Sequence, residues 1–374
     1  MNIVASSPQG LEKTLSKEIH DLGGTNIKIF KRFISFNCDI ETLYRIHFYS
    51  RIAFRFYREI ARFPCLDKYS LYEGVQKSFD WLNWLSPDKS FYVQVTGKNP
   101  ILRHSHFTAL QVKNAIVDLQ NKSFGDRSDI SLDSPDLVIH LHLNSHEAIV
   151  SLQTTIESLH KRGYRPAMAD APLKENLAAG LIQITEWDGN KPLLDIMCGS
   201  GILMIEAISQ YLRVPNLIKR NYLFENWADF NKDIFIKEKL KIKRRPIKNL
   251  KIPKVIGCEI NTEIFMQAKK NILLAGVDQY IEIYNMDFAN LKNNCEPGII
   301  LCNPPYGIRI GQESELVDLY SKLGIYLKEN FSGWTFWLLS GNAKMTKYLK
   351  MKASLKFPIS NGGIDCRWIK YVIR

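Results

Sequence analysis

The stretch Gly298-Ile299-Ile300-Leu301-Cys302-Asn303-Pro304-Pro305-Tyr306 decides the fold class of this chain. Its apolar start predicts a buried parallel strand, and the prolines that follow cannot continue a strand ladder. In open α/β sheets, ligands bind just outside the carboxyl ends of the strands. The side-chain oxygen of Asn303 and the carbonyl of Pro304 offer two acceptors to a planar amino group, and Tyr306 offers a ring for stacking. We therefore predict that Asn303, Pro304, Pro305 and Tyr306 form a catalytic segment; spacing alone leaves a Pro-Pro turn capped by a core tyrosine as the alternative.

The residues on either side of this stretch alternate strands with helices. Strands are predicted at 192–195, 254–258, 281–284, 298–302, 334–339, 353–357 and 367–373, and helices at 175–186, 262–275 and 316–328. This alternation predicts an α/β fold with a parallel, doubly wound sheet over residues 166–374. The strongly basic insertion at 213–254 predicts a solvated face.

A second ligand-binding signal follows the first of these strands, at Asp195-Ile196-Met197-Cys198-Gly199-Ser200-Gly201. The loop lacks the third glycine of a dinucleotide fingerprint and the lysine of a phosphate-binding loop. It therefore suits a ligand without a pyrophosphate, such as S-adenosylmethionine. Glu259 ends the second strand, where an acidic residue binds ribose hydroxyls, and Asp287-Phe288 ends the third, where a carboxylate and a ring suit adenine. The predicted cofactor-binding residues are Asp195, Cys198, Gly199, Ser200, Gly201, Glu259, Asp287 and Phe288.

The N-terminal part predicts two smaller α+β units. Residues 1–63 follow the order βαββαβ of a ferredoxin-like unit. Residues 64–165 form a second unit, in which positive charge lies beside the start of a basic helix at 106–121, a natural phosphate site. A basic segment with Gly and Pro closes this unit. The predicted RNA-binding residues are Lys98, Arg103, Lys113, Arg162 and Arg165; an ordinary solvated loop is the alternative around Arg103.

Composition narrows the class of partner. The chain of 374 residues carries 50 Lys and Arg against 38 Asp and Glu, and this net charge of +12 favours a polyanion such as nucleic acid. The N-terminus lacks the pattern of a secretory signal, and no window is long and apolar enough to span a membrane. The 7 cysteines are scattered without a C-x-x-C pair, which argues against disulfides and metal centres and predicts a cytoplasmic location.

Together these motifs resemble a class I S-adenosylmethionine-dependent methyltransferase of the amino-methylating type, preceded by ferredoxin-like and THUMP domains. Further segments resemble those of THUMP-bearing RNA guanine-N2 methyltransferases, and in particular the N-terminal half of the bacterial large-subunit rRNA enzyme: Arg162-Gly163-Tyr164-Arg165, residues 171–179 and Phe224-Glu225-Asn226-Trp227. The resemblance spans essentially the whole chain. Departures from the family pattern are Ile196-Met197 for Pro-Phe, Ile202 for Thr, Glu259 for Asp and Ile308 for Glu; none removes a group that the chemistry requires.

The resemblance implies a Rossmann-like methyltransferase domain with S-adenosylmethionine as cofactor, acting on the N2 amino group of a guanosine in RNA. Ribosomal 23S RNA is favoured over tRNA, and a monomer or weak dimer is expected. The target base would flip out and stack on Tyr306, while Asn303 and Pro304 accept from its amino group. Methylation of a protein glutamine, methylation of DNA adenine and a non-catalytic role in ribosome assembly stay open as alternatives. The nucleotide, and single or double methylation, are also open.

Overall fold

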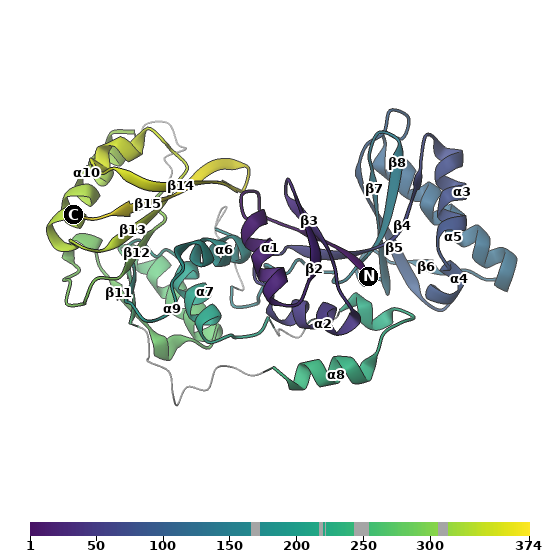
Figure 1. The fold of residues 1–374 in the computed structure, drawn as a ribbon, viewed down its shortest axis with the longest axis horizontal. Helices are drawn as coiled ribbons and strands as arrows, with labels where there is room; N and C mark the ends of the chain where they lie inside the picture. Colours follow the sequence, from purple (N-terminus) through teal and green to yellow (C-terminus); the bar gives the residue numbers. More distant parts are fainter. Residues whose placement is uncertain (166–172, 217–219, 221, 243–253, 306–312) are drawn as a thin grey trace.

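The computed structural model describes residues 1–165, 173–216, 220, 222–242, 254–305 and 313–374. Its strands form two sheets, which lie on either side of the middle of an elongated molecule (Figure 1). Residues 1–165, here called the N-terminal half, build an eight-stranded sheet, and the residues from 173 onward, the C-terminal half, build a seven-stranded sheet. Among the described residues, no helix has the length and apolar character that crossing a membrane requires.

The eight-stranded sheet has the order β2-β3-β1-β4-β8-β7-β5-β6. Its strands are β1 (Asn2–Ser6), β2 (Thr25–Phe30), β3 (Phe33–Asn37), β4 (Arg55–Pro64), β5 (Ser90–Gly97), β6 (Asp129–Ile130), β7 (Leu137–Leu143) and β8 (Glu147–Gln153). Strand β4 pairs with β1 on one side and with β8 on the other. The sheet therefore runs without a break through the two units that the sequence predicts.

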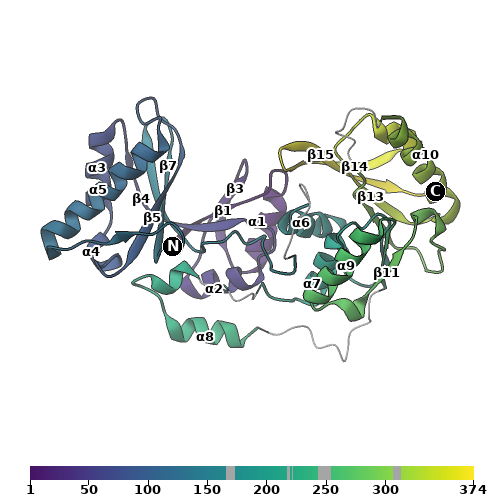
Figure 2. The ribbon, with the colours of Figure 1, turned by 180° about the vertical axis from the view of Figure 1, so that it is seen from behind.

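Helices cover one face of this sheet. They are α1 (Glu12–Asp21), α2 (Ile40–Tyr49), α3 (Lys68–Ser78), the short α4 (Trp81–Trp84) and α5 (Ser105–Phe124). Side chains alternate between the two faces of each strand, so Ile3 and Ala5 of β1 are fully buried in the core between sheet and helices. Helices α3 and α5 lie together on the outer side of the sheet (Figure 2). The other face carries no helix in the part of the chain that the structure describes.

The seven-stranded sheet has the order β11-β10-β9-β12-β13-β15-β14. Its strands are β9 (Leu193–Asp195), β10 (Val255–Glu259), β11 (Ile281–Asn285), β12 (Ile299–Cys302), β13 (Thr335–Ser340), β14 (Ala353–Asn361) and β15 (Ile364–Val372), and its helices are α6 (Glu175–Thr185), α7 (Ile202–Tyr211), α9 (Thr262–Leu274) and α10 (Glu313–Asn330). The predicted α/β fold is confirmed.

The sheet is parallel, as the alternation predicts, except at one edge. Strands β11, β10, β9, β12 and β13 are parallel, but β15 is antiparallel to both β13 and β14. Strands β14 and β15 are joined by a hairpin turn at Gly362 and Gly363, whose φ angles are +59° and +88°. A turn this short can only connect antiparallel strands, because a parallel connection needs a crossover of a dozen or more residues.

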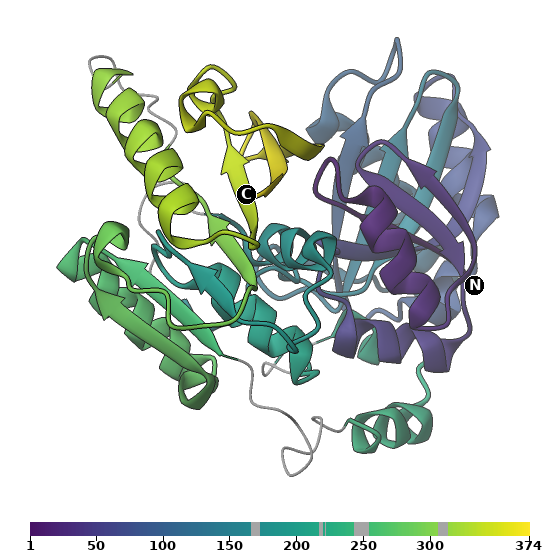
Figure 3. The same ribbon diagram turned by 60° about the vertical axis from the view of Figure 1, so that its left-hand side comes forward.

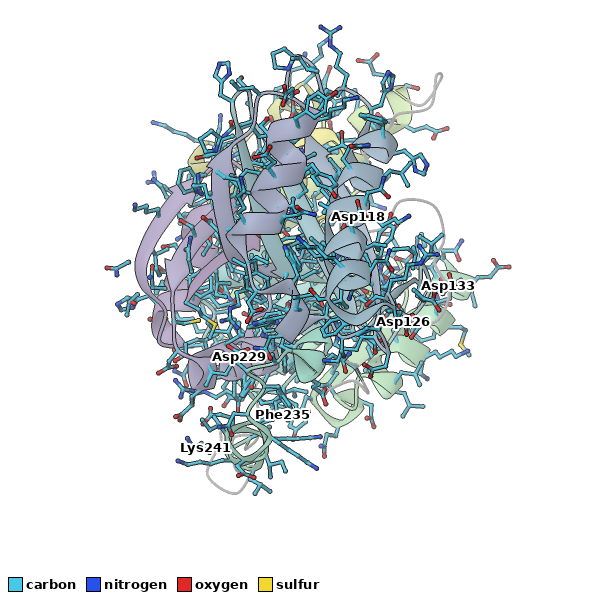
Figure 4. The ribbon with its side chains drawn as sticks, turned by 90° about the vertical axis from the view of Figure 1, so that its right-hand side faces the viewer. Asp118, Asp126, Asp133, Asp229, Phe235 and Lys241 are labelled. Carbon is cyan, nitrogen blue, oxygen red and sulfur yellow. The ribbon has the colours of Figure 1, made fainter. Side chains whose placement is uncertain are left out.

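The described part of the insertion between α7 and β10 forms the predicted solvated face only in part: Lys232, Lys237 and Lys239 are exposed, but other residues are buried, and residues 243–253 lie outside the described residues. Its described residues 222–242, here called the latch, include α8 (Lys232–Leu240) and pack against the N-terminal half. Phe235 is buried edge-on against Tyr44, with ring centroids 5.3 Å apart. Asp229 accepts from Arg58 at 2.6 Å, and Lys241 contacts a carboxylate of α2. Figure 4 labels Asp229, Phe235 and Lys241 along this segment.

Candidate active site

The predicted site residues meet at the carboxyl edge of the seven-stranded sheet, in the half of the molecule that Figure 3 brings forward. Strand β9 lies between β10 and β12, and Asp195 is in register with Gly257 on one side and Leu301 on the other. Asn303 follows two residues after Leu301, so Asp195 and Asn303 leave adjacent strands at the same edge. This is the point where the strand order reverses, and ligands bind there in open α/β sheets.

Asp195 has the most perturbed carboxyl group of this edge. Its side chain is 1% exposed, and neither oxygen has a well-formed hydrogen bond within the described residues. Burial raises its pKa to about 8; the main-chain N–H of Met197 lowers the pKa and the negative charge of Glu259 raises it further. A buried carboxylate without a partner is costly, so this position favours a ligand that brings its own cationic donor. The ammonium group at the amino-acid end of S-adenosylmethionine is such a donor.

The glycine loop after β9 leaves open space for a ligand. Gly199 has a φ of +53°, and a Cβ built on it would meet nothing within 4 Å. Gly201 has a φ of +79° and begins α7. The carboxylate of Glu259 fixes the loop, because one oxygen accepts from the N–H of Gly199 at 3.0 Å and the other from the N–H of Asn261 at 2.9 Å. Glu259 therefore connects the loop to the end of β10 while its remaining lone pairs can accept from ribose hydroxyls.

Cys198 and Ser200 hold the same loop through their main chains. The N–H of Cys198 donates to the carbonyl of Cys258 at 2.9 Å, and the carbonyl of Ser200 accepts from the side chain of Asn271 at 3.1 Å. Burial raises the pKa of the Cys198 thiol well above its usual value, so this thiol stays protonated. Cys198 and Ser200 thus shape the loop, and neither supplies a reactive side chain.

The end of β11 carries Asp287 and Phe288 in different environments. Burial alone would raise the pKa of Asp287, but an ion pair with Lys322 at 2.7 Å and a hydrogen bond from the N–H of Ala289 lower it. The ring of Phe288 is 5% exposed and packs edge-on against Tyr326. Phe288 thus lies at the edge of the core directly after Asp287, and its place beside an adenine ring stays a prediction. Lys322 was missed, because its partner lies on another element and no local pattern marks the pair.

The catalytic segment begins directly after β12. Asn303 is half-buried, Pro304 is buried and Pro305 is exposed. Tyr306 and Ile308 lie outside the described residues. The two acceptors expected from the sequence, the Asn303 side chain and the Pro304 carbonyl, thus follow the strand next to Asp195.

Comparison with known proteins shows the domain families of this chain. A family model described as an RMKL-like methyltransferase domain matches residues 162–370, a THUMP domain model matches 69–153, and an RlmL ferredoxin-like domain model matches 2–57. The chain belongs to the RMKL-like methyltransferase family.

Full-length relatives support the assignment. The chain is 38% identical over 368 residues to a Synechocystis sp. protein provisionally named as an RNA methyltransferase, covering 98% of this chain and 95% of the relative. It is 35% identical to the ribosomal RNA large subunit methyltransferase K/L of Vibrio parahaemolyticus over 99% of this chain, but it covers 53% of that protein. The chain thus spans about half the length of the K/L relative.

A solved structure supports the cofactor. The crystal structure of SMU.472, provisionally assigned as a methyltransferase and complexed with SAH, matches 100% of this chain and 98% of its own, with a TM-score of 0.91 and 25% identity. SAH is S-adenosylhomocysteine, the product left when S-adenosylmethionine gives up its methyl group. This RMKL-like methyltransferase therefore uses S-adenosylmethionine, and the orphaned carboxylate of Asp195 and the open space over Gly199 fit that cofactor.

The residues predicted to bind RNA fall into two groups. Lys98 and Arg103 are exposed before the start of α5, and Lys113 is half-buried in the middle of that helix, so these positions are compatible with an RNA contact. The positions of Arg162 and Arg165 do not fit a contact with RNA, because both side chains are buried in ion pairs. Arg162 pairs with a carboxylate of α7 at 2.8 Å, and Arg165 pairs with the first residue of α6 at 3.3 Å. Both arginines connect segments of the RMKL-like methyltransferase inside the protein.

Proposed function

We propose that this RMKL-like methyltransferase methylates the exocyclic N2 amino group of a guanosine in RNA, with 23S rRNA as the favoured substrate. The observation that supports it best is the position of Asn303 and Pro304, which leave β12 beside the orphaned carboxylate of Asp195. The THUMP domain and the similarity to large-subunit rRNA methyltransferases support RNA as the substrate class.

Some residues of the site would hold the cofactor, and others would orient the amino group of the target base. Asp195, Gly199 and Glu259 would hold the cofactor, which supplies a methyl group on a positively charged sulfonium. The Asn303 side-chain oxygen and the Pro304 carbonyl accept the two N–H bonds of the target amino group and so direct its lone pair. Methyl transfer would form a nitrogen–carbon bond as the sulfur–carbon bond of the cofactor breaks, and the nitrogen would lose its proton to water. Positioning carries most of this catalysis, because no strong base is required.

The test is mass spectrometry of nucleosides from rRNA and tRNA of a strain lacking the gene, complemented with wild-type protein or with Asn303→Ala. We expect N2-methylguanosine to be missing from 23S rRNA and restored only by the wild type. In vitro, Asn303→Ala should lower the turnover number by about 10²- to 10³-fold, the usual effect of losing one orienting group. Its affinity for S-adenosylhomocysteine should stay within about threefold.

Each competing activity predicts a different result. Loss of N2-methylguanosine from tRNA alone would move the substrate to tRNA, and loss of a methylated protein glutamine would replace RNA as the substrate class. Unchanged nucleosides together with normal cofactor binding would favour a non-catalytic assembly factor. Full activity of Asn303→Ala would refute the proposed orienting role.

A further inference from the structure

The face of the eight-stranded sheet opposite the helices is an open hollow. Along each strand, the residues that alternate with the buried core residues line this hollow, as Asn2, Val4 and Ser6 do on β1. The hollow has a volume of about 1450 Å³ and is lined by strands of both the ferredoxin-like and the THUMP regions. Its floor includes Tyr57 and His140, whose rings lie 4.6 Å apart. A continuous surface of polar and aromatic side chains therefore crosses the whole N-terminal half.

A second hollow connects this surface to the catalytic edge. It has a volume of about 680 Å³ and lies between the β2–β3 turn and the β14–β15 hairpin, and it reaches Ser340 at the end of β13. Strand β13 is parallel to β12 with Leu338 opposite Cys302, so Ser340 lies at the same sheet edge as the catalytic segment. Phe30 lines both hollows. A ligand that follows the sheet face past Phe30 thus arrives beside the candidate active site.

Two phenyl rings stand exposed at this junction. Phe30 and Phe33 are 44% and 37% exposed and stack on each other, with ring centroids 4.7 Å apart and planes 11° from parallel. The turn between them is fixed, although Arg32 has a φ of +70°. The N–H of Arg32 donates to Glu12 at 2.8 Å, and its carbonyl accepts from the N–H of Ser7 at 2.8 Å. Strained backbone and exposed apolar side chains are both typical of binding surfaces, and the β2–β3 turn combines the two.

Positive charge surrounds the rings. Lys13, Lys31, Lys356 and Arg367 line the second hollow and outnumber its two carboxylates, Glu12 and Asp365. Lys28 and Arg32 line the first hollow. None of these cations forms an ion pair with another residue that the structure describes. The outer, helical side of the N-terminal half exposes charges of both signs: Asp118, Asp126 and Asp133, which Figure 4 labels, lie there together with Lys77, Lys122 and Arg127. A polyanion is therefore attracted to the hollow side.

We propose that the open sheet face and the β2–β3 turn form a track for an unpaired strand of the RNA substrate. One base of that strand stacks on the free face of the Phe30–Phe33 pair, and Lys31 and Arg32 contact the adjoining phosphates. Exposed aromatic rings on a sheet bind unstacked bases, whereas a duplex presents no free base face. The inference rests on the proposed function, because the occupant is the RNA that is methylated.

The first experiment compares three variants in binding a labelled, unstructured 15-nucleotide RNA, measured by fluorescence anisotropy with S-adenosylhomocysteine present. Phe30→Ala/Phe33→Ala should weaken binding by about 5- to 150-fold, the range for losing one stacked base. Phe30→Trp keeps an aromatic face and should bind within about threefold of wild type. Phe124→Ala is the matched control, because Phe124 is 49% exposed but lies at the end of α5, near Asp126 on the helical side. Its affinity should not change.

Two further measurements make the outcome decisive. A 15-base-pair RNA duplex should compete at least about tenfold less well than the single strand. The salt dependence of binding should fall in slope by about 0.7 for Lys31→Ala, the value for one lost contact with a single-stranded phosphate. Binding by the double variant within twofold of wild type, at an unchanged urea midpoint, would overturn the proposal, and so would equal competition by the duplex.

The failure of this proposal differs from the failure of the proposed function. Nucleoside analysis of the wild-type product tests the function without any change in the track. If wild-type protein makes N2-methylguanosine but the double variant binds RNA normally, only the track is wrong. If the double variant loses RNA binding while another methylated nucleoside is found, only the guanosine assignment is wrong.

Discussion

Glu206 of α7 is the residue whose substitution tests most directly how the two halves are held together. Its carboxylate is fully buried and pairs with Arg51 at 3.0 Å and Arg162 at 2.8 Å, and it accepts from the hydroxyl of Tyr164 at 3.0 Å. Arg51 follows α2 in the N-terminal half, whereas Glu206 lies in the helix that starts at the cofactor loop. The network therefore joins the N-terminal half to the helix beside the candidate active site.

Glu206→Gln keeps the volume of the side chain but removes its charge. Two buried guanidinium groups then face each other without a counter-charge, and breaking a buried ion pair in this way costs about 3–5 kcal/mol. With a urea slope of about 3 kcal/mol per molar, the unfolding midpoint should fall by at least about 1 M. The measurement is urea denaturation followed by tryptophan fluorescence.

A charge-free replacement separates charge balance from packing. In Arg51→Met/Arg162→Met/Glu206→Met all three ionic groups are removed together, and such replacements are often neutral or stabilising. We therefore expect the triple variant to unfold at a higher urea concentration than Glu206→Gln. A loss of less than about 1 kcal/mol in Glu206→Gln, or a triple variant weaker than the single one, would refute the reasoning.

The other predictions concern the cofactor edge. The pKa of about 8 for Asp195 implies that this carboxyl is protonated at pH 6. Because the cofactor ammonium requires the carboxylate, affinity for S-adenosylhomocysteine should rise about tenfold per pH unit from pH 6 to 7 and level off above pH 8. A flat pH profile in calorimetry would contradict this. Its folded-state pKa lies above the ordinary 3.8, so without ligand the same group costs stability increasingly as pH rises from about 4 to 8. Gly199→Ala and Gly276→Ala place a Cβ at φ of +53° and +65° with nothing within 4 Å, and each should cost about 1 kcal/mol of stability. Only Gly199→Ala should weaken cofactor binding; equal affinities would show that the space over Gly199 is not the cofactor site.

Local patterns predicted much of the fold. The predicted strand at 298–302 agrees within one residue with β12 (Ile299–Cys302), because its apolar residues follow one another directly before the prolines. The glycine loop and the acidic strand ends could likewise be predicted as site residues, because each motif consists of a few consecutive residues. The antiparallel edge hairpin could not be predicted in this way, because strand direction depends on the length of a connection and not on the strands themselves.

Long-range partners explain the rest. Arg162 looks like an RNA contact when only its neighbours in sequence are considered, but the carboxylate of Glu206 lies opposite it in the fold. The latch carries many charges, yet its Phe235 packs against Tyr44 of α2, which is almost two hundred residues away in the sequence. In both cases the sequence shows a charge or a ring, and only the tertiary structure shows whether its partner is water, RNA or protein.

Several contacts between the N-terminal and C-terminal halves together favour a fixed distance between the two halves. A third contact joins them besides the Glu206 network and the latch: Gly10 lies so close to the β14–β15 hairpin that a Cβ on it would be 2.1 Å from the carbonyl oxygen of Pro358. These contacts lie at different sites around the junction, so a hinge at one of them would have to break another. We infer that the distance from the Phe30–Phe33 pair to Asn303 is set by the fold. This fixed distance supports the proposal of an RNA track, because a strand held in the track would present one nucleotide to Asn303 by its distance from the Phe30–Phe33 pair.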